Sequence, residues 1–588
     1  MHNVTPSRSD ANTAAAFSAT ASMLPPSSAP LRFLRSWRWP VQQWAPRTVA
    51  VVLALWCTLL LNQALWHKLA GLADFSDPWM LRRAAIVVLV GSATYLWFML
   101  WSWPRVRRVA WSVNLVLAAA VQYYMLRYGM VMDSSMVRNV LQTNFTEGLA
   151  LFSPGMLVHV ALYAGLPVLW LYRGVQCKTG QARRGWMLSA LAVLLALGTM
   201  VGSGLAMYRE LAPLLRNHTE IRYLINPLAT VVSFAQVTLK PLFKPNRPFR
   251  AITEGAVLGG TYAAAAASTH KPPLLVLVVG ETARADHFGL NGYPRDTTPE
   301  LTARHVINWT QAWSCGTNTL ASVPCMFSHL GKSGYEGRKF EYGNLMDVLQ
   351  AAGLGVDWLD NQSGCKGVCD RIPHAQADQI ATPAEVKQWC KDSECLDQLM
   401  VGLLDQRLQA LPEAARSKGA VLVLHQMGSH GPAYHRRSSA ATKQFKPECT
   451  THVTSDCSHA ELVNVYDNSM RETDLFVART IDWLQKQQGQ YETALMYVSD
   501  HGESLGENGL YLHGLPYAIA PDTQKHVPWL LWPGSLQART GMSETCARAS
   551  VEQRITHDNY FHTVLGMLDV QTPLYKKELD MLQPCRPA

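Results

Sequence analysis

"LLVLVVGET", residues 274–282, is an apolar run that ends in a glycine, an acid and a hydroxyl. A short, continuous apolar run bounded by turn residues is typical of a strand that is buried on both faces of a sheet. Three more runs of this kind follow: GVDWLD (355–360), AVLVLH (420–425) and TALMYVS (493–499). Helical patterns separate them, near 344–352, 396–411 and 466–488. The alternation predicts an α/β domain with a central, mostly parallel sheet covered by helices.

Polar side chains follow each of these runs. In open parallel sheets, ligands bind beyond the carboxyl ends of the strands, so the residues after each strand matter most. They are Glu281 and Thr282, residues 361–363, residues 426–430 and the pair Asp500–His501. A single polar residue after a strand is usually a turn former, and Glu281 could simply pair with Arg284. Four such ends together predict a functional site, and carboxylate and imidazole are ligands of catalytic zinc.

The segment SCGTNTLASVPCM, residues 314–326, offers hydroxyl groups between Cys315 and Cys325. A bound zinc ion stabilises a deprotonated hydroxyl and makes it a nucleophile. We expect the segment to open a helix, whose first N–H groups would face an incoming phosphate. A disulfide between the two cysteines would hold the hydroxyl in place. Spacing alone does not choose between Thr317 and Thr319.

The first part of the chain is apolar enough to lie in a membrane. The 588 residues include only 16% charged residues, below the roughly 25% of a soluble domain. Five runs have about the 20 residues that cross a bilayer. They lie near 49–66, 84–103, 109–126, 155–172 and 185–205. The predicted domains are a disordered cytoplasmic tail (1–48), a five-helix membrane domain (49–205), a bridge of short helices (206–270) and a catalytic domain (271–588).

Charges and cysteines indicate the orientation of the chain. The net charge of +9 suggests an anionic partner, but several basic residues lie before the first run and in alternate loops, where they favour the cytoplasmic side. An odd number of spans then places residues 271–588 outside the cell membrane. Ten of the 12 cysteines lie in that part, and disulfides explain them better than zinc ribbons. The predicted pairs are 315/325, 365/369, 390/395, 449/457 and 546/585.

The loop at 127–154 between the third and fourth runs contains MDSSMVRNVLQTN. Its mixed apolar and polar spacing predicts a short helix that lies at the membrane interface.

Several ordered motifs carry a family resemblance. They are VVGETARADHFGLNGYPRDTTPEL, SCGTNTLASVPCMFS, DNQSGCKGVCDR, LHQMGSHGPAY and SDHGESLGENGLYLHG. The chain resembles the lipid A phosphoethanolamine transferases, a family of the alkaline phosphatase superfamily that includes the mobile colistin resistance enzymes. The resemblance covers almost all of the soluble part, the five spans and the NVLQTN segment. It implies an alkaline phosphatase/sulfatase-like catalytic domain.

The resemblance also implies roles for individual residues. Thr319 would be the nucleophile, and Glu281, Thr319, Asp500 and His501 would bind zinc. His430 and His513 would bind substrate phosphate, assist proton transfer or hold a second zinc ion. Lys366 and Ser363 match polar residues near the ethanolamine or phosphate, Gln362 replaces a frequent asparagine, and Glu503 would contact the substrate ammonium.

The implied reaction moves phosphoethanolamine from phosphatidylethanolamine to phosphate groups of lipid A through a phosphothreonine intermediate, which would lower the affinity for polymyxins. It would take place at a bacterial inner membrane, on the periplasmic side, with the N-terminus in the cytoplasm. We expect a membrane-embedded monomer without a nucleic-acid partner.

Four other interpretations remain open to comparison. A sulfatase would need a Cys/Ser-x-Pro-x-Arg segment, and the residues around Cys325 do not supply one. A phosphoglycerol transferase resembling the lipoteichoic acid synthases would share the spans and the threonine, and a phosphoethanolamine transferase could act on core sugars or periplasmic glucans. A non-catalytic lipid-binding or sensor protein would be expected to lack Thr319 or Asp500, and both are present.

Overall fold

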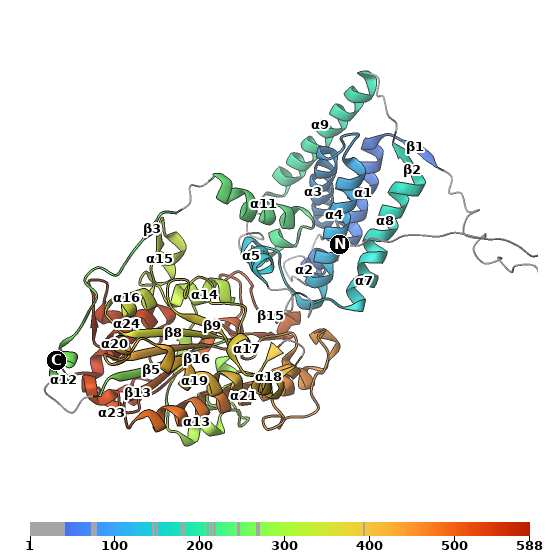
Figure 1. Ribbon diagram of the computed structural model, residues 1–588. Coiled ribbons are helices and arrows are strands. Elements are labelled where there is room, and N and C mark those ends of the chain that lie inside the picture. The colour runs from blue at the N-terminus through green and yellow to red at the C-terminus, as the bar shows by residue number, and fades with distance from the viewer. Residues whose placement is uncertain are drawn as a thin grey trace, which may run out of the picture.

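The computed structural model describes residues 41–71, 79–143, 148, 151–177, 183–208, 211, 215, 219–243, 247–265, 271–391 and 394–587. Most of the predicted tail, residues 1–40, and parts of the predicted bridge lie outside the described residues. A group of long helices lies beside a larger body built around a sheet (Figure 1).

The long apolar helices form the first of these two bodies. They are α1 (Pro46–Leu60), α2 (Gln63–Ala70), α3 (Trp79–Leu100), α4 (Arg107–Tyr128), the helical stretch Pro154–Gly174 that contains α7 (Pro154–Val160) and α8 (Leu166–Leu169), and α9 (Arg183–Ala206). Within the described residues, three of them are long and apolar enough to cross a membrane, at 107–128, 154–174 and 183–206. These three match the last three predicted spans. The full count of five is not confirmed.

The first predicted span is broken. α1 and α2 meet at an angle of 46°, and they make a fourth span only if this bent pair is counted as one. At the break, the Asn62 side chain donates to the carbonyls of Cys57 (2.8 Å) and Asn226 (2.7 Å). The Asn226 backbone N–H donates in return to Asn62 at 2.8 Å. This exchange satisfies polar groups that would otherwise be costly to bury. The apolar part of α3 that the structure describes covers Ala84–Leu100.

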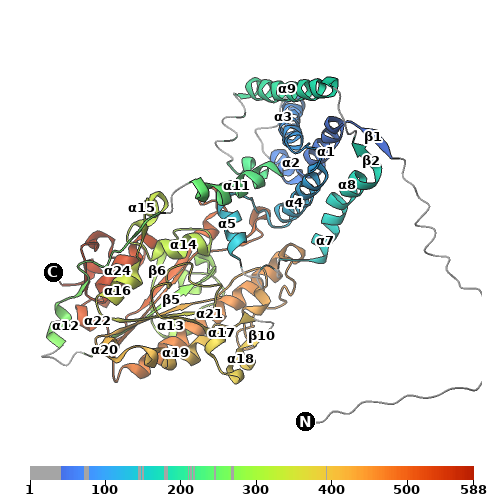
Figure 2. The same cartoon turned by 45° about the horizontal axis from the view of Figure 1, so that its top comes forward.

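Two helices lie between the membrane helices and the sheet body. The predicted helix in the 127–154 loop is confirmed as α5 (Ser134–Gln142), whose N-cap Asp133 accepts the Met136 N–H at 2.8 Å. In the predicted bridge, α11 (Leu228–Phe243) is 16 residues long, so the expectation of short helices alone was wrong. Both helices face the larger body (Figure 2).

The larger body contains a mixed sheet, in which the structure describes eight strands in the order β17-β6-β16-β13-β5-β12-β8-β9. Their bounds are β5 Pro273–Gly280, β6 Ile307–Trp313, β8 Gly355–Asp360, β9 His374–Gln376, β12 Ala420–His425, β13 Glu492–Ser499, β16 His526–Trp532 and β17 Ile555–Thr556. The four predicted strands are the neighbours β13, β5, β12 and β8, and they run parallel. β16 runs antiparallel to both of its neighbours, so the sheet is mixed.

Helices cover both faces of the sheet (Figure 1). Leu274, Val276 and Val278 of β5 pack into a core with α19 (Gln398–Ala410) and α21 (His459–Gln487). The alternate residues Leu275, Leu277 and Val279 pack into a second core with α14 (Thr319–Met326), α16 (Leu345–Ala351) and α24 (Tyr560–Met567). Two apolar faces explain why the strand is an uninterrupted apolar run.

Shorter elements complete the body: α12 Gly260–Ala265, α13 Pro299–Ala303, α15 Gly331–Gly337, α17 Ala377–Ile380, α18 Pro383–Trp389, α20 Glu413–Arg416, α22 Gln537–Thr540, α23 Glu544–Ala549, and the hairpin of β14 (Ser504–Leu505) and β15 (Tyr511–Leu512).

All five predicted disulfides form among the described residues, at 315–325, 365–369, 390–395, 449–457 and 546–585. Cys57 and Cys177 are free and buried.

The C-terminal end of α4 contacts the sheet body directly. Arg127 pairs with Asp456 at 2.7 Å. Gly129 adopts a φ of +66°, and a Cβ atom placed on it would lie 2.7 Å from the Gly509 carbonyl and 2.9 Å from the Leu510 side chain. Only glycine therefore fits this contact without strain.

Candidate active site

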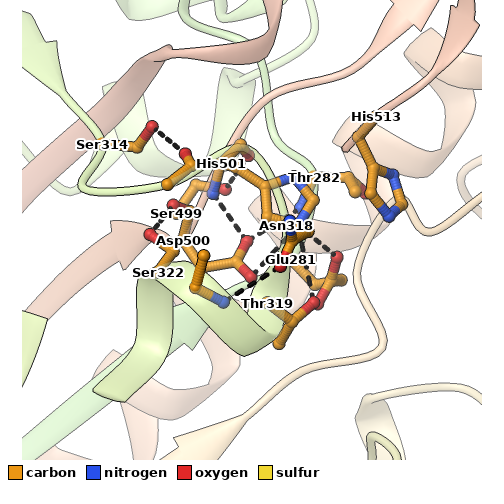
Figure 3. A network of polar contacts seen from close by, with 12 residues as sticks. Glu281, Thr282, Ser314, Asn318, Thr319, Ser322, Ser499, Asp500, His501 and His513 are labelled. Carbon is orange, nitrogen blue, oxygen red and sulfur yellow. Dashed lines mark hydrogen bonds and ion pairs between the residues drawn. The ribbon is translucent and has the colours of Figure 1, made fainter. Parts of the chain in front are cut away.

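The ends of two neighbouring strands and the start of one helix meet at one point (Figure 3). Glu281 follows β5, and Asp500 and His501 follow β13, its parallel neighbour. Thr319 is the first residue of α14. Its hydroxyl donates to Glu281 Oε2 at 3.0 Å and lies 3.5 Å from His501 Nε2. His501 Nε2 lies 3.3 Å from Glu281 Oε1 and 3.3 Å from Asp500 Oδ2.

The structure separates the two threonines that spacing left open. The Thr317 hydroxyl donates to the Leu515 carbonyl at 2.6 Å, so it is occupied in holding the loop. The Thr319 hydroxyl instead faces two acids and an imidazole. Asn318, the N-cap of α14, accepts the Ala321 N–H at 3.0 Å and fixes the start of the helix beneath Thr319.

The orientation of His501 leaves Nε2 free to act as a ligand. Its Nδ1 lies 2.9 Å from the Gly502 carbonyl, which can only accept, so Nδ1 carries the proton. Asp500 Oδ1 accepts from the His501 N–H (2.7 Å) and the Thr282 N–H (3.3 Å). Among the described residues, Asp500 Oδ2 and Glu281 Oε1 are buried without a hydrogen-bond partner. Two unpartnered carboxylate oxygens, an imidazole nitrogen and a hydroxyl fit the ligand set of a catalytic zinc ion.

The electrostatics of the site also fit a cation. Burial and the nearby Asp500 raise the pKa of Glu281 to about 8, and burial raises the pKa of Asp500 to about 7. Burial holds the pKa of His501 well below its usual value. Two buried acids so close together repel each other when charged, and a divalent cation would relieve that repulsion.

His513 and His430 extend the site on one side. Ligand atoms of Glu281, His501 and His513 all lie within 4.8 Å of one another. His513 Nδ1 lies 3.3 Å from Glu503 Oε2; burial lowers the pKa of His513, but Glu503 outweighs it and the pKa is raised to about 9. The His430 ring centre lies 5.3 Å from that of His513, and burial holds the pKa of His430 well below its usual value.

The other predicted residues lie nearby with different partners. Gln362 donates from Nε2 to Glu281 Oε2 at 2.9 Å, so it holds a candidate zinc ligand. Lys366 donates to the Ser363 hydroxyl at 2.6 Å. Glu503 is fully buried, and its Oε1 has no hydrogen-bond partner in the described part of the chain.

A small cavity of about 90 Å³ opens onto Thr319. Its lining combines predicted site residues with residues from α5 and its flanks: Thr319, Gln362, Ser363, Lys366, His430 and His513 on one side, and Met136, Asn139 and Thr143 on the other. A larger cleft of about 930 Å³ runs along the other side of the α14 start, past Thr317, Asn318 and Lys366. The candidate active site therefore faces the helix between the two bodies.

Sequence reasoning missed the residues that support the site through the backbone. Asp397 accepts the N–H groups of Met427 (2.8 Å) and Gly428 (2.9 Å) and so fixes the loop after β12. His557, far along the chain, contacts main-chain atoms of the catalytic segments. Neither follows a predicted strand, and no local pattern distinguishes them.

Two family models match the chain. One, described as Phosphoethanolamine transferase EptA/EptB, matches residues 89–242, and the other, Sulfatase, matches residues 273–570. Phosphoethanolamine transferase EptA of Salmonella typhimurium is 37% identical over 511 residues, which cover 84% of this chain and 87% of the relative. Phosphatidylethanolamine transferase Mcr-1 of Escherichia coli is 34% identical over 537 residues, which cover 90% of this chain and 96% of the relative.

A solved structure is similar along nearly the whole chain. It is the integral membrane protein lipooligosaccharide phosphoethanolamine transferase A (EptA) from Neisseria meningitidis, with a TM-score of 0.86 and 33% identity. The match covers 93% of this chain and 100% of that structure, so membrane helices and sheet body are both included.

Proposed function

The chain belongs to the phosphoethanolamine transferase family, with a catalytic domain of the sulfatase family, and on that premise we propose that it transfers phosphoethanolamine from phosphatidylethanolamine to a phosphate group of lipid A. The name of the relative Mcr-1 supports the donor, and the name of the Neisseria EptA structure supports a lipooligosaccharide acceptor. The observation that carries the proposal is the Thr319 hydroxyl, 3.0 Å from Glu281 and 3.5 Å from His501 at the mouth of a cavity.

Glu281, Thr319, Asp500 and His501 are the proposed zinc ligands. Zinc bound there would stabilise the deprotonated Thr319 hydroxyl and withdraw charge from the phosphate oxygens. His513, when it is unprotonated, offers a ligand for a second ion, and the His430 ring lies beside it. The unpartnered oxygens of Glu281 and Asp500 support the first of these two zinc sites.

The reaction then takes two displacements at phosphorus. Thr319 passes its hydroxyl proton to Glu281 Oε2, to which it donates at 3.0 Å, and its Oγ1 forms a bond to the phosphorus of phosphatidylethanolamine. The bond to the diacylglycerol oxygen breaks, a phosphothreonine that carries the ethanolamine remains, and His513, with its raised pKa, gives a proton to the departing oxygen. In the second displacement a lipid A phosphate oxygen loses its proton to His513 and attacks the phosphorus, the bond to Thr319 breaks, and Thr319 Oγ1 takes its proton back from Glu281. The α14 N–H groups offer donors to the phosphoryl oxygens in both steps.

Substrate recognition falls to the cavity and the cleft beside Thr319. Lys366 and Ser363 would bind phosphate oxygens, and Glu503 Oε1 is the unpartnered atom that could accept from the ethanolamine ammonium. Six basic and four acidic side chains line the larger cleft, and Arg338 among them pairs with Glu341. The excess of positive charge and the volume of the cleft suit a phosphorylated sugar headgroup. This charge favours lipid A phosphates over neutral glucans as the acceptor.

The placement in the cell follows from charge and disulfides. We propose five spans in a bacterial inner membrane, a cytoplasmic N-terminus and a periplasmic catalytic domain. The five disulfides, all at residues 315–585, support an oxidising compartment. Adding an ammonium beside each lipid A phosphate would weaken the attraction of cationic polymyxins.

Mass spectrometry of lipid A from cells that express the chain tests the proposal. The wild-type chain should add one phosphoethanolamine unit, and Thr319→Ala should reduce the modified fraction at least about 1000-fold. Thr317→Ala, which removes only the hydrogen bond to Leu515, should retain part of the activity. Unmodified lipid A, or modification that survives Thr319→Ala at equal expression, would refute the proposal. Phosphoethanolamine found on core sugars or glucans would identify those sugars as the acceptor in place of lipid A.

A further inference from the structure

His557 contacts three parts of the active site from behind. It begins a short helical turn, His557–Asn559, after the edge strand β17, and it is 1% exposed. Its Nδ1 accepts the Cys315 N–H at 3.1 Å in the loop before Thr319. The same nitrogen lies 3.3 Å from the Ser322 hydroxyl, one turn into α14. Its Nε2 lies 3.0 Å from the Ser499 carbonyl, at the end of β13.

These partners fix the imidazole in a single form. The Cys315 N–H can only donate, so Nδ1 must be unprotonated. The Ser499 carbonyl can only accept, so Nε2 must carry the hydrogen. In a protonated ring, the N–H at Nδ1 would point at the N–H of Cys315, and neither group could accept. Burial lowers the pKa of His557 to about 3, which agrees with a permanently neutral ring.

Ser322 adds a second link between the same two segments. Its hydroxyl donates to the Asp500 carbonyl at 2.5 Å, so the nucleophile helix is bonded directly to a proposed zinc ligand. Figure 3 shows Ser322 and Ser499 on either side of Asp500. His557 and Ser322 together join the helix that starts at Thr319 to the strand end that carries Asp500 and His501.

We propose that His557 is a positioning residue of the transfer reaction, which sets the place of the Thr319 loop relative to the Asp500–His501 strand end. The inference rests on the proposed function. His557 touches no reacting atom, so it would act only through its hydrogen bonds to Cys315 and Ser499. A misplacement of about 1 Å between nucleophile and ligands can cost about 100-fold in rate.

Two substitutions separate the two sides of the ring. An asparagine amide oxygen can occupy the position of Nδ1, so His557→Asn keeps the acceptor for Cys315 and loses the donor to Ser499. A glutamine amide nitrogen can occupy the position of Nε2, so His557→Gln keeps the donor to Ser499 and loses the acceptor for Cys315. We expect His557→Gln to lower kcat about 10- to 100-fold with zinc affinity unchanged. We expect His557→Asn to weaken zinc affinity about 10-fold as well.

The measurements use the full-length protein in detergent with a fluorescent phosphatidylethanolamine: kcat and KM, zinc affinity by competition with a chelator, and Tm. His562→Asn is the matched control, because His562 is fully buried in α24 and its Nδ1 accepts only the Lys576 N–H, at 3.2 Å. The control should lose Tm but keep kcat and zinc affinity within about twofold.

Three results would overturn the inference. They are kcat and zinc affinity at wild-type levels in both His557 variants, equal losses in the His562 control, and failure of both His557 variants to fold when the control folds. An inactive wild-type chain would instead count against the proposed function, and the zinc affinities would still decide the role of His557.

Discussion

Gln362 follows β8, the parallel neighbour of β12, and connects the end of that strand to the candidate site. Its side chain is buried and donates to the same Glu281 oxygen that accepts from Thr319. Outer partners of this kind hold a ligating carboxylate in place, and their removal typically costs 10- to 100-fold in metal affinity. We therefore expect Gln362→Leu to weaken zinc binding about 10-fold, measured by chelator competition. Gln398→Leu, which removes a buried amide bonded to Arg479, should leave zinc affinity unchanged, and a loss there equal to that of Gln362→Leu would contradict the role of Gln362.

The raised carboxyl pKa values give the site a distinct pH dependence. Burial and Asp500 raise the pKa of Glu281 to about 8, whereas an unfolded glutamate titrates near about 4.3. Between these values the folded, metal-free protein binds more protons than the unfolded chain, so its stability falls as pH rises. Zinc displaces those protons, so its affinity rises over the same range.

The expected outcome is that the metal-free Tm of the wild type, measured relative to that of Glu281→Gln, falls from about pH 5 to about pH 8, and that the Tm gain from added zinc grows over that range. Glu281→Gln has no carboxyl to titrate at this position and should give a flatter profile. A zinc-induced gain that shrinks as pH rises would count against the site.

Three of the four proposed zinc ligands follow a recognisable pattern, because Glu281, Asp500 and His501 come directly after strands. The pattern around Thr319, a helix start between two cysteines, left Thr317 equally open, and only the family resemblance pointed to Thr319. His557 could not be predicted, since its contacts are to main-chain atoms of residues more than fifty positions away. Such contacts depend on tertiary packing and leave no periodic signal in the sequence.

At the scale of elements, the 315–325 disulfide encloses the Thr319 loop and most of α14. Removing it should release the loop that holds Thr319, the proposed nucleophile. We expect Cys315→Ser/Cys325→Ser to lower kcat about 10- to 100-fold. In the chain-entropy account, a crosslink over only 10 residues adds less stability than one over 39, as between Cys546 and Cys585.

The matched control is therefore Cys546→Ser/Cys585→Ser, which should lose more Tm but less activity. Parallel measurements of kcat and Tm on both variants decide the question. If activity followed Tm in the same way for both pairs, the local role of the 315–325 disulfide would be wrong.

The central strands could be predicted almost to the residue, and the outer ones could not. β5, β12, β8 and β13 are buried on both faces, so their sequences are nearly continuous apolar runs. β6, INWTQAW, has exposed and polar positions near the sheet edge, and β17 is two residues long. The prolines in and around α11 likewise obscured helix boundaries in the bridge, and the break at Asn62 did so in the membrane part.

At the scale of the molecule, α4 touches the catalytic body at Gly129. A side chain there would collide with Gly509 and Leu510, and its φ of +66° disfavours any other residue. We expect Gly129→Val to disturb the approach of the catalytic body to the membrane helices. Transfer from phosphatidylethanolamine should fall about 10-fold, whereas cleavage of a small soluble phosphodiester should stay within about twofold of wild type.

Gly148→Val serves as the control, because no atom of the described residues lies within 4 Å of a Cβ placed there. Equal losses on the lipid and on the soluble substrate would show that the contact at Gly129 supports the catalytic body itself.

The order of the crosslinks has a consequence for how cells make the protein. The ten cysteines of the catalytic domain pair in chain order, the first with the second, the third with the fourth and so on. Four of the five loops that they close span at most 10 residues. During export, every bridge can close as soon as its second thiol emerges, before the sheet assembles. Bacteria that lack the periplasmic disulfide isomerase should therefore accumulate the enzyme normally, whereas loss of the thiol oxidase should deplete it.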